Sequence, residues 1–148
     1  MIIPIWLQTA FKELGIHERR DRERVKEYLA VCGLGNREPI NTPWCAAFIA
    51  WTLKESGMKY LESAHARDWL DYGMNIDQEW PRCGDLVILW RGAIDSTAGH
   101  VGFYIGRDNA HCYLLSGNQG DMVTIKPYDG TRILGARRPI VKRKVVAV

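Results

Sequence analysis

The feature that most constrains the fold is a change in hydrophobic periodicity near Pro81. Before this point apolar residues recur at helical spacing, and after it short β-branched or aromatic runs alternate with turn residues. Helices followed by strands are typical of an α+β domain with its helices packed on one side of an antiparallel sheet. We therefore predict an α+β fold with helices at about 5–15, 20–32, 43–56 and 63–72, and strands at about 85–90, 100–106, 112–116, 122–128 and 132–138.

The length of 148 residues fits one domain, which we place over 1–148 with a core of about 4–139 and a basic tail at 140–148. No apolar run approaches the roughly 20 residues of a membrane span, so we expect no integral membrane segment. The apolar N-terminal stretch lacks a basic region and a small-residue cleavage site. We interpret it as a first helix and expect a protein made in the cytoplasm without a signal peptide.

Charge and cysteine content limit the partners and cofactors that the protein is expected to have. The net charge is only +3 and no concentrated basic face or known binding motif is visible, so we expect no nucleic-acid partner. The four cysteines are widely spaced and form no CxxC pair, whereas structural zinc sites usually show such pairs. We expect free thiols, no metal and no cofactor.

Cys45 is the first candidate for chemistry, in the stretch PWCAAF at 43–48. If a helix begins there, unpaired N–H groups and the helix dipole favour a thiolate, and the same N–H groups can hold an oxyanion. Taken alone, a cysteine in an apolar helix is more often a core residue. A catalytic role requires a base elsewhere in the chain.

His100 is the best candidate for that base among four histidines. It follows Gly99 and opens the predicted strand HVGFYIG, from which its side chain can project toward a neighbouring helix end. The others fit a solvated helix or a turn: His17, His65 and His111.

A third, orienting residue is expected on the next strand, in SGNQGD at 116–121. If this strand continues straight, Ser116 and Asn118 share one face and Gln119 points to the other. Asn118 could accept the imidazole N–H and select the tautomer, so we predict Asn118 for this position and keep Gln119 as the alternative.

These motifs together resemble the CHAP and NlpC/P60 superfamily of papain-like cysteine hydrolases, especially small peptidoglycan-degrading members from phage lysins and bacteria. The resemblance runs from about Pro4 to Pro139 and is carried by PWCAAFIAWTLKESG, SAHARDWLDYG, PRCGDLVILWRG, GHVGFYIG and LLSGNQGDMVTIKPY. It implies a papain-like α+β core whose nucleophile helix packs on a sheet of about five or six antiparallel strands. It also implies that Cys45 is the nucleophile, His100 the base and Asn118 the third residue.

The resemblance further implies a peptidoglycan hydrolase of the endolysin type, which cuts an amide bond of the stem peptide as an endopeptidase or as an N-acetylmuramoyl-L-alanine amidase. Trp44, Ser116 and Gln119 are the residues that we expect to contact substrate. A monomer of this kind would act on the cell wall or in the periplasm after holin-assisted release or delivery by a secretion system.

Three alternatives stay open at this stage. The same chemistry could serve an antibacterial effector, or it could act on protein amides. A third possibility is a non-catalytic cell-wall-binding domain on the same fold, which would bind sacculi without releasing new amine ends.

Overall fold

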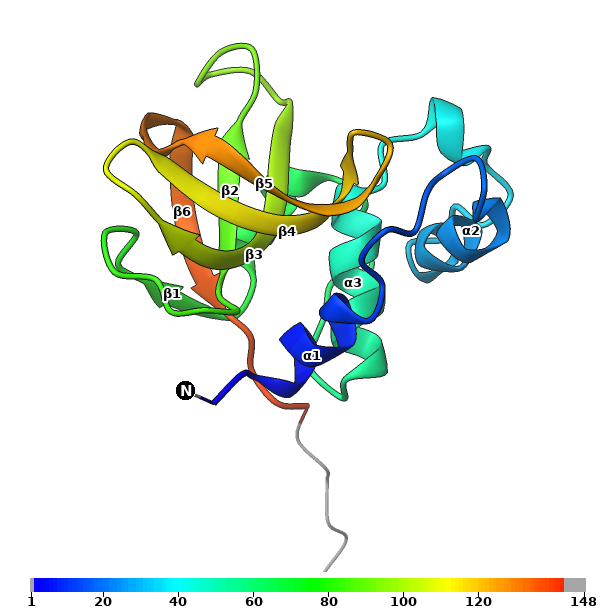
Figure 1. Cartoon of the computed structure of the whole chain (residues 1–148), viewed down its shortest axis with the longest axis horizontal. Coiled ribbons are helices and arrows are strands. Elements are labelled where there is room, and N and C mark those ends of the chain that lie inside the picture. The colour runs from blue at the N-terminus through cyan, green and yellow to red at the C-terminus, as the bar shows by residue number, and fades with distance from the viewer. Residues whose placement is uncertain (1, 143–148) are drawn as a thin grey trace, which may run out of the picture.

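The computed structural model describes residues 2–142, and these contain three α-helices packed on one antiparallel sheet (Figure 1). The α-helices are α1 (Ile5–Phe11), α2 (Arg22–Val31) and α3 (Cys45–Glu55), and the short 3-10 helices are η1 (Pro39–Asn41), η2 (Ala66–Asp71) and η3 (Gly130–Arg132). The strands are β1 (Met74–Ile76), β2 (Leu86–Trp90), β3 (Gly99–Arg107), β4 (His111–Gln119), β5 (Met122–Asp129) and β6 (Ile133–Arg138).

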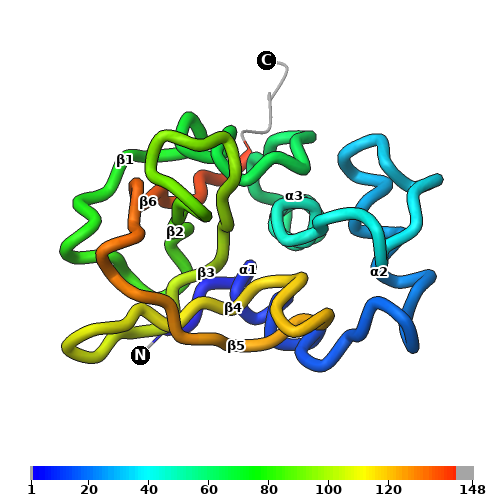
Figure 2. Tube along the Cα trace, turned by 90° about the horizontal axis from the view of Figure 1, so that it is seen from above, coloured from blue at the N-terminus to red at the C-terminus, as the bar shows by residue number. Residues whose placement is uncertain are grey.

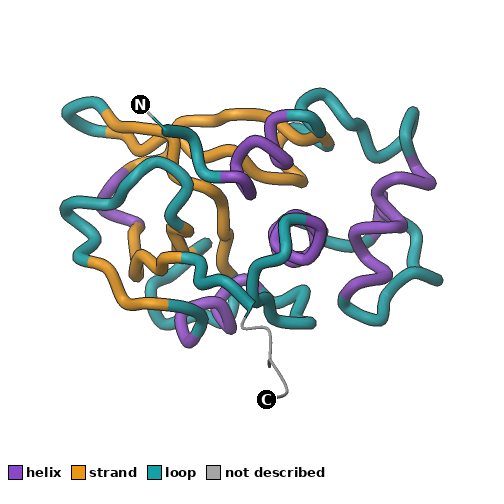
Figure 3. Tube along the Cα trace, turned by 90° about the horizontal axis from the view of Figure 1, so that it is seen from below, coloured by secondary structure: helices purple, strands orange, loops and turns teal. Residues whose placement is uncertain are grey.

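The six strands lie in the order β1-β6-β2-β3-β4-β5, and every neighbouring pair is antiparallel. This confirms the predicted α+β class and the antiparallel sheet. Figure 3 shows the strands gathered on one side of the molecule, with α2 and α3 on the other. Strand β3, which begins one residue before His100, lies between β2 and β4 in the middle of the sheet.

Helix α3 is the centre of the core. Its residues from Cys45 to Leu53 are all buried, because the sequence CAAFIAWTL is apolar on every side and such a helix is stable only when it is surrounded. It contacts β3, β4, α1 and α2. Figure 2 looks along α3 and shows it between α2 and the sheet.

The start of α3 lies against β4 at unusually short range. A Cβ atom added to Gly117 would stand 2.5 Å from the ring of Trp44, which is closer than side chains pack. Glycine at this position therefore lets the strand backbone approach the aromatic ring directly before Cys45. Trp44 is fully buried, and its indole N–H donates to Glu18 at 3.2 Å.

Several element boundaries differ from those predicted. The segment at 63–72 is a 3-10 helix that begins after His65, because the hydroxyl of Ser63 accepts the His65 N–H and donates to Asp68 instead of capping an α-helix. Strand β1 was not predicted, since it has only three residues and forms by pairing with the distant β6. Strand β4 extends to Gln119, beyond the predicted end at 116.

A buried ion pair joins the start of β2 to the end of β6. Asp85, directly before β2, is 2% exposed and receives both Nε and Nη2 of Arg138, each at 2.9 Å. The backbone N–H of Arg82 donates to the same carboxylate at 2.7 Å. Asp85 therefore stabilises the turn before β2 and the start of that strand.

No helix within residues 2–142 has the length and apolar character needed to cross a membrane. The predicted basic tail at 140–148 falls for the most part on residues 143–148, which lie outside the described residues.

Candidate active site

Cys45 is the first residue of α3, and Trp44 is its N-cap. The N–H groups of the first helical turn lack acceptors within the helix and surround the thiol. The backbone of Val101, on the neighbouring β3, also forms a hydrogen bond with the thiol. Because Val101 follows His100 directly, this contact brings the helix start and the histidine strand together.

The thiol of Cys45 is buried, with 5% of the residue exposed. Burial raises the pKa of the Cys45 thiol, and the backbone of Val101, the nearby Arg91 and the helix start only partly offset this effect. The helix start favours the thiolate, as expected, but burial outweighs this effect and keeps the thiol neutral in this state. A neutral thiol needs a neighbouring base to become a nucleophile.

His100 lies fully buried near the start of β3, and both ring nitrogens have partners. Its Nε2 lies 2.9 Å from Oε1 of Gln119 and 3.2 Å from the hydroxyl of Tyr128. The Tyr128 hydroxyl donates to the same Gln119 oxygen at 2.9 Å. Since that oxygen can only accept, the network places a proton on Nε2 of His100 and leaves Nδ1 with its lone pair.

The amide of Gln119 is itself held in one orientation. Its Nε2 donates to the carbonyl of Thr124 at 2.8 Å and to the carbonyl of Leu114 at 3.2 Å. With the NH₂ group committed to backbone acceptors, the oxygen has to face the imidazole. The result is a neutral orienting group for His100.

The structure corrects the prediction that Asn118 makes this contact. The register between β4 and β5 shifts between Ser116 and Gln119, and Asn118 has a left-handed backbone with φ of 58°. An extra residue in a strand reverses the faces of the residues that follow. Gln119 is thereby turned toward His100, whereas a straight strand would have presented Asn118.

Two of the residues expected to contact substrate are also corrected. Trp44 and Ser116 are both fully buried, and the Ser116 hydroxyl donates to the carbonyl of Val101 at 2.7 Å. They support the helix start and the strand, and they present no surface to a ligand. Gln119 is 3% exposed and is occupied with His100.

The imidazole of His100 is neutral in this state. Burial lowers the pKa of His100 to about 4, while the hydrogen bond with Gln119 acts in the opposite direction. The cations Arg91, Arg132 and Lys126 lower this pKa further. A neutral imidazole that carries no proton on Nδ1 has the form that a general base requires.

A groove of about 270 Å³ opens at Cys45. Its other lining residues are small or apolar for the most part, and they are Leu34, Thr42, Pro43, Ala64, His65, Ala66, Ala98 and Gly99. Because Cys45 and Gly99 line the same groove, a bound amide could reach the thiol beside the start of the histidine strand.

Sequence reasoning missed Tyr128, Arg91 and the place of His65 in the groove. Tyr128 stands near the end of β5, and only the β4–β5 pairing brings its hydroxyl to His100. Arg91 directly follows β2, and its Nη2 lies 3.4 Å from Nδ1 of His100. The one available signal was the position of Arg91 at the end of the strand that pairs with the histidine strand.

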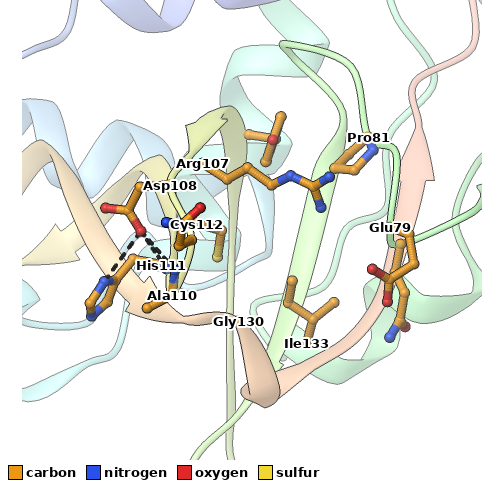
Figure 4. A pocket seen from close by; sticks show the side chains of 12 residues that line it. Glu79, Pro81, Arg107, Asp108, Ala110, His111, Cys112, Gly130 and Ile133 are labelled. Carbon is orange, nitrogen blue, oxygen red and sulfur yellow. Dashed lines mark hydrogen bonds and ion pairs between the residues drawn. The ribbon is translucent and has the colours of Figure 1, made fainter.

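A second hollow, of about 190 Å³, lies near the opposite end of β3 (Figure 4). Its best-placed acid, Asp108, accepts the backbone N–H groups of Ala110 and His111 at 2.9 and 2.8 Å and the hydroxyl of Tyr113 at 2.8 Å. These bonds complete the β3–β4 turn. Within residues 2–142 no cluster of three histidine, cysteine or acidic side chains is arranged to hold a metal ion.

A cysteine at a helix start, a histidine on the adjacent strand and an amide that orients the histidine make up the set of groups that thiol-dependent acyl transfer requires. The sequence profile of the NlpC/P60 family matches residues 35–146, and the chain belongs to this family. Members of the family are typically cysteine peptidases that act on peptidoglycan.

A similar fold is found in a solved structure of another protein. A Staphylococcus aureus protein described as similar to lipoprotein, NLP/P60 family, is 20% identical with a TM-score of 0.56, covering 94% of this chain and 41% of that one. An NlpC/P60 family protein from Bacillus cereus is 23% identical with a TM-score of 0.48, covering 64% of this chain and 30% of that one. The chain thus spans less than half the length of either protein. No curated protein sequence matches the chain.

Proposed function

We propose that the protein is a cysteine hydrolase that cuts an amide bond in the stem peptide of peptidoglycan. The observation that carries the proposal is the network at His100, in which Gln119 and Tyr128 hold one ring nitrogen and leave the other as a base near Cys45. Membership of the NlpC/P60 family supplies the substrate class.

In this mechanism, Nδ1 of His100 takes the proton of the Cys45 thiol as the sulfur attacks the scissile carbonyl carbon. The backbone N–H groups at the start of α3 hold the oxyanion of the tetrahedral intermediate. The imidazolium then protonates the leaving amine, and the C–N bond breaks to give a thioester. Water, deprotonated by His100, hydrolyses the thioester and restores the thiol.

Gln119 and Tyr128 act on His100 rather than on the substrate. Gln119 accepts a hydrogen bond from Nε2–H of His100 throughout the cycle, which keeps the basic lone pair on Nδ1. A neutral amide in this position orients the ring without adding a negative charge. The electrostatic support of the imidazolium therefore has to come from another group.

Purified peptidoglycan provides the test of the activity. The wild-type protein should release soluble fragments with new amine ends, and Cys45→Ala and His100→Ala should each lower the rate by at least about a thousandfold. Cys32→Ala is the matched control, because Cys32 is a partly buried cysteine at the end of α2, outside the candidate site. Full activity in either site variant, with the fold intact by circular dichroism, would remove this mechanism.

We further propose that this activity serves cell-wall lysis, as in an endolysin. Mass spectrometry of the released muropeptides identifies the bond, because the new termini name the residues on either side. Binding to sacculi with no new termini in any fragment would instead support a non-catalytic wall-binding domain.

A further inference from the structure

Positive charge lies around the base of the candidate site; Asp129 lies near Arg132, but no carboxylate of the described residues acts on His100. Arg91, Arg132 and Lys126 all act on His100, and among the described residues none of the three forms an ion pair with a carboxylate. Arg132 donates Nε and Nη2 to the carbonyl of Trp90 at 3.0 and 2.9 Å, and its guanidinium lies over the Trp90 and Tyr128 rings. Its place is therefore fixed beside the site.

Arg91 is the cation that touches the reacting atoms. Its Nη2 lies 3.4 Å from Nδ1 of His100, the nitrogen whose lone pair has to take the proton of Cys45. A guanidinium donor at this position competes with the thiol for the lone pair. Its charge also opposes formation of the imidazolium. In the resting state Arg91 thus restrains the base.

Among the described residues, no carboxylate acts on the His100 ring. The orienting group on Nε2 is the neutral amide of Gln119, supported by the neutral hydroxyl of Tyr128. On the side of the groove, the lining residues next to Cys45 include no carboxylate. The charge balance of the site is completed only when a negatively charged group enters from outside.

We propose that the substrate brings this group: the scissile amide lies beside a free carboxylate, which pairs with Arg91 and draws its guanidinium away from Nδ1 of His100. The inference rests on the proposed hydrolase function and names a requirement of its substrate. A guanidinium and a carboxylate can pair through two parallel hydrogen bonds, and within residues 2–142 the Nε and Nη1 groups of Arg91 form no hydrogen bond. The same contact both selects the substrate and releases the base.

The loop that carries Arg91 is held firmly, so its response to a ligand is a movement of the side chain. Arg67 donates to the carbonyls of Ala98, Ile94 and Ala93 at 2.8, 2.9 and 3.1 Å. The carbonyl of Arg91 accepts the Ser96 hydroxyl at 2.8 Å. With the backbone pinned at both ends of the loop, the guanidinium can leave His100 without disturbing the histidine strand.

The substrate side of the proposal is tested with pairs of synthetic stem peptides. The two peptides of a pair differ at one carboxylate near the scissile bond, which is free in one and amidated in the other. A separate pair is made for each such carboxylate. For the wild-type protein, amidation of the recognised carboxylate should lower kcat/KM by about tenfold to a hundredfold, the range of a lost charge-assisted hydrogen bond. Equal rates on every pair would overturn the inference.

Arg91→Gln supplies the protein side of the test. It should cleave the free and amidated peptides at similar rates, and its rate on the amidated peptide should equal or exceed that of the wild type because the base is no longer restrained. Arg91→Lys keeps the charge and should retain part of the preference. A full preference in Arg91→Gln would contradict the assignment to Arg91.

Arg107→Gln is the matched control, since it removes the same charge from the other end of β3, about 20 Å away along the strand, and should keep the wild-type preference.

The outcomes separate the inference from the function on which it rests. If the wild type releases new amine ends from purified peptidoglycan but shows no carboxylate preference, only the inference fails. If it cleaves neither peptidoglycan nor any peptide, the proposed function fails.

Discussion

The side-chain oxygen of Gln119 lies 2.9 Å from Nε2 of His100, and the Tyr128 hydroxyl donates to that oxygen from 2.9 Å. This relationship selects the imidazole tautomer that carries its proton on Nε2 and its lone pair on Nδ1. It depends on the irregular register of β4, because a straight strand would turn Gln119 away.

Replacing Gln119 should lower activity more than replacing its neighbour. Gln119→Ala removes the acceptor of the Nε2 proton and should reduce kcat about tenfold to a hundredfold with a smaller change in KM. Asn118→Gly is the matched variant, since glycine tolerates the φ of 58° at that position, and it should keep at least about half of the wild-type rate. Steady-state kinetics on purified peptidoglycan fragments decides the matter, and a larger loss in Asn118→Gly would reverse the assignment.

His100 should make the stability depend on pH. Its pKa is about 4 in the folded protein, below its ordinary value of 6.5, so the unfolded chain binds more protons than the folded one between these values. The free energy of unfolding should therefore fall as the pH drops from 6.5 to 4, by up to about 3 kcal/mol from this group.

Urea unfolding of the wild type and His100→Asn across this pH range isolates that contribution, because other titrating groups affect both proteins alike. The wild type should lose more stability on acidification than the variant. Parallel curves for the two proteins would show that His100 titrates normally.

Gly117 should not tolerate a side chain. The Cβ atom of Gly117→Ala would stand 2.5 Å from the Trp44 ring, and separating the start of α3 from β4 should cost about 1–3 kcal/mol. Gly106→Ala is the control, because it lies in β3 with no atom within 4 Å of the added Cβ. Thermal unfolding should show a lower Tm for Gly117→Ala and an unchanged or higher Tm for Gly106→Ala.

The buried pair of Asp85 and Arg138 should matter far more than a surface pair. Asp85→Asn leaves the Arg138 guanidinium, partly buried between β2 and β6, without its counter-charge, which should cost about 3 kcal/mol. Arg22→Gln breaks the exposed pair with Glu38 and should shift the denaturant midpoint little, because solvent screens such a pair. Denaturant midpoints give both values, and equal losses would mean that Asp85 contributes only as a surface charge.

The sequence alone determined the class of the fold and the places of Cys45 and His100. Both follow from local signals: a change in hydrophobic period, a proline and an apolar run at a helix start, and a glycine before a strand. The positions of these two residues at the ends of α3 and β3 need no knowledge of distant contacts.

Tertiary structure decided which residues surround the imidazole. Asn118 and Gln119 are adjacent in sequence, and the choice between them depends on the register shift where β4 pairs with β5. Arg91 and Tyr128 reach His100 across 9 and 28 residues of sequence. Burial likewise set the neutral state of Cys45, since desolvation outweighs the helix start. Each of these outcomes arises from contacts between separate strands, and local propensity carries no information about them.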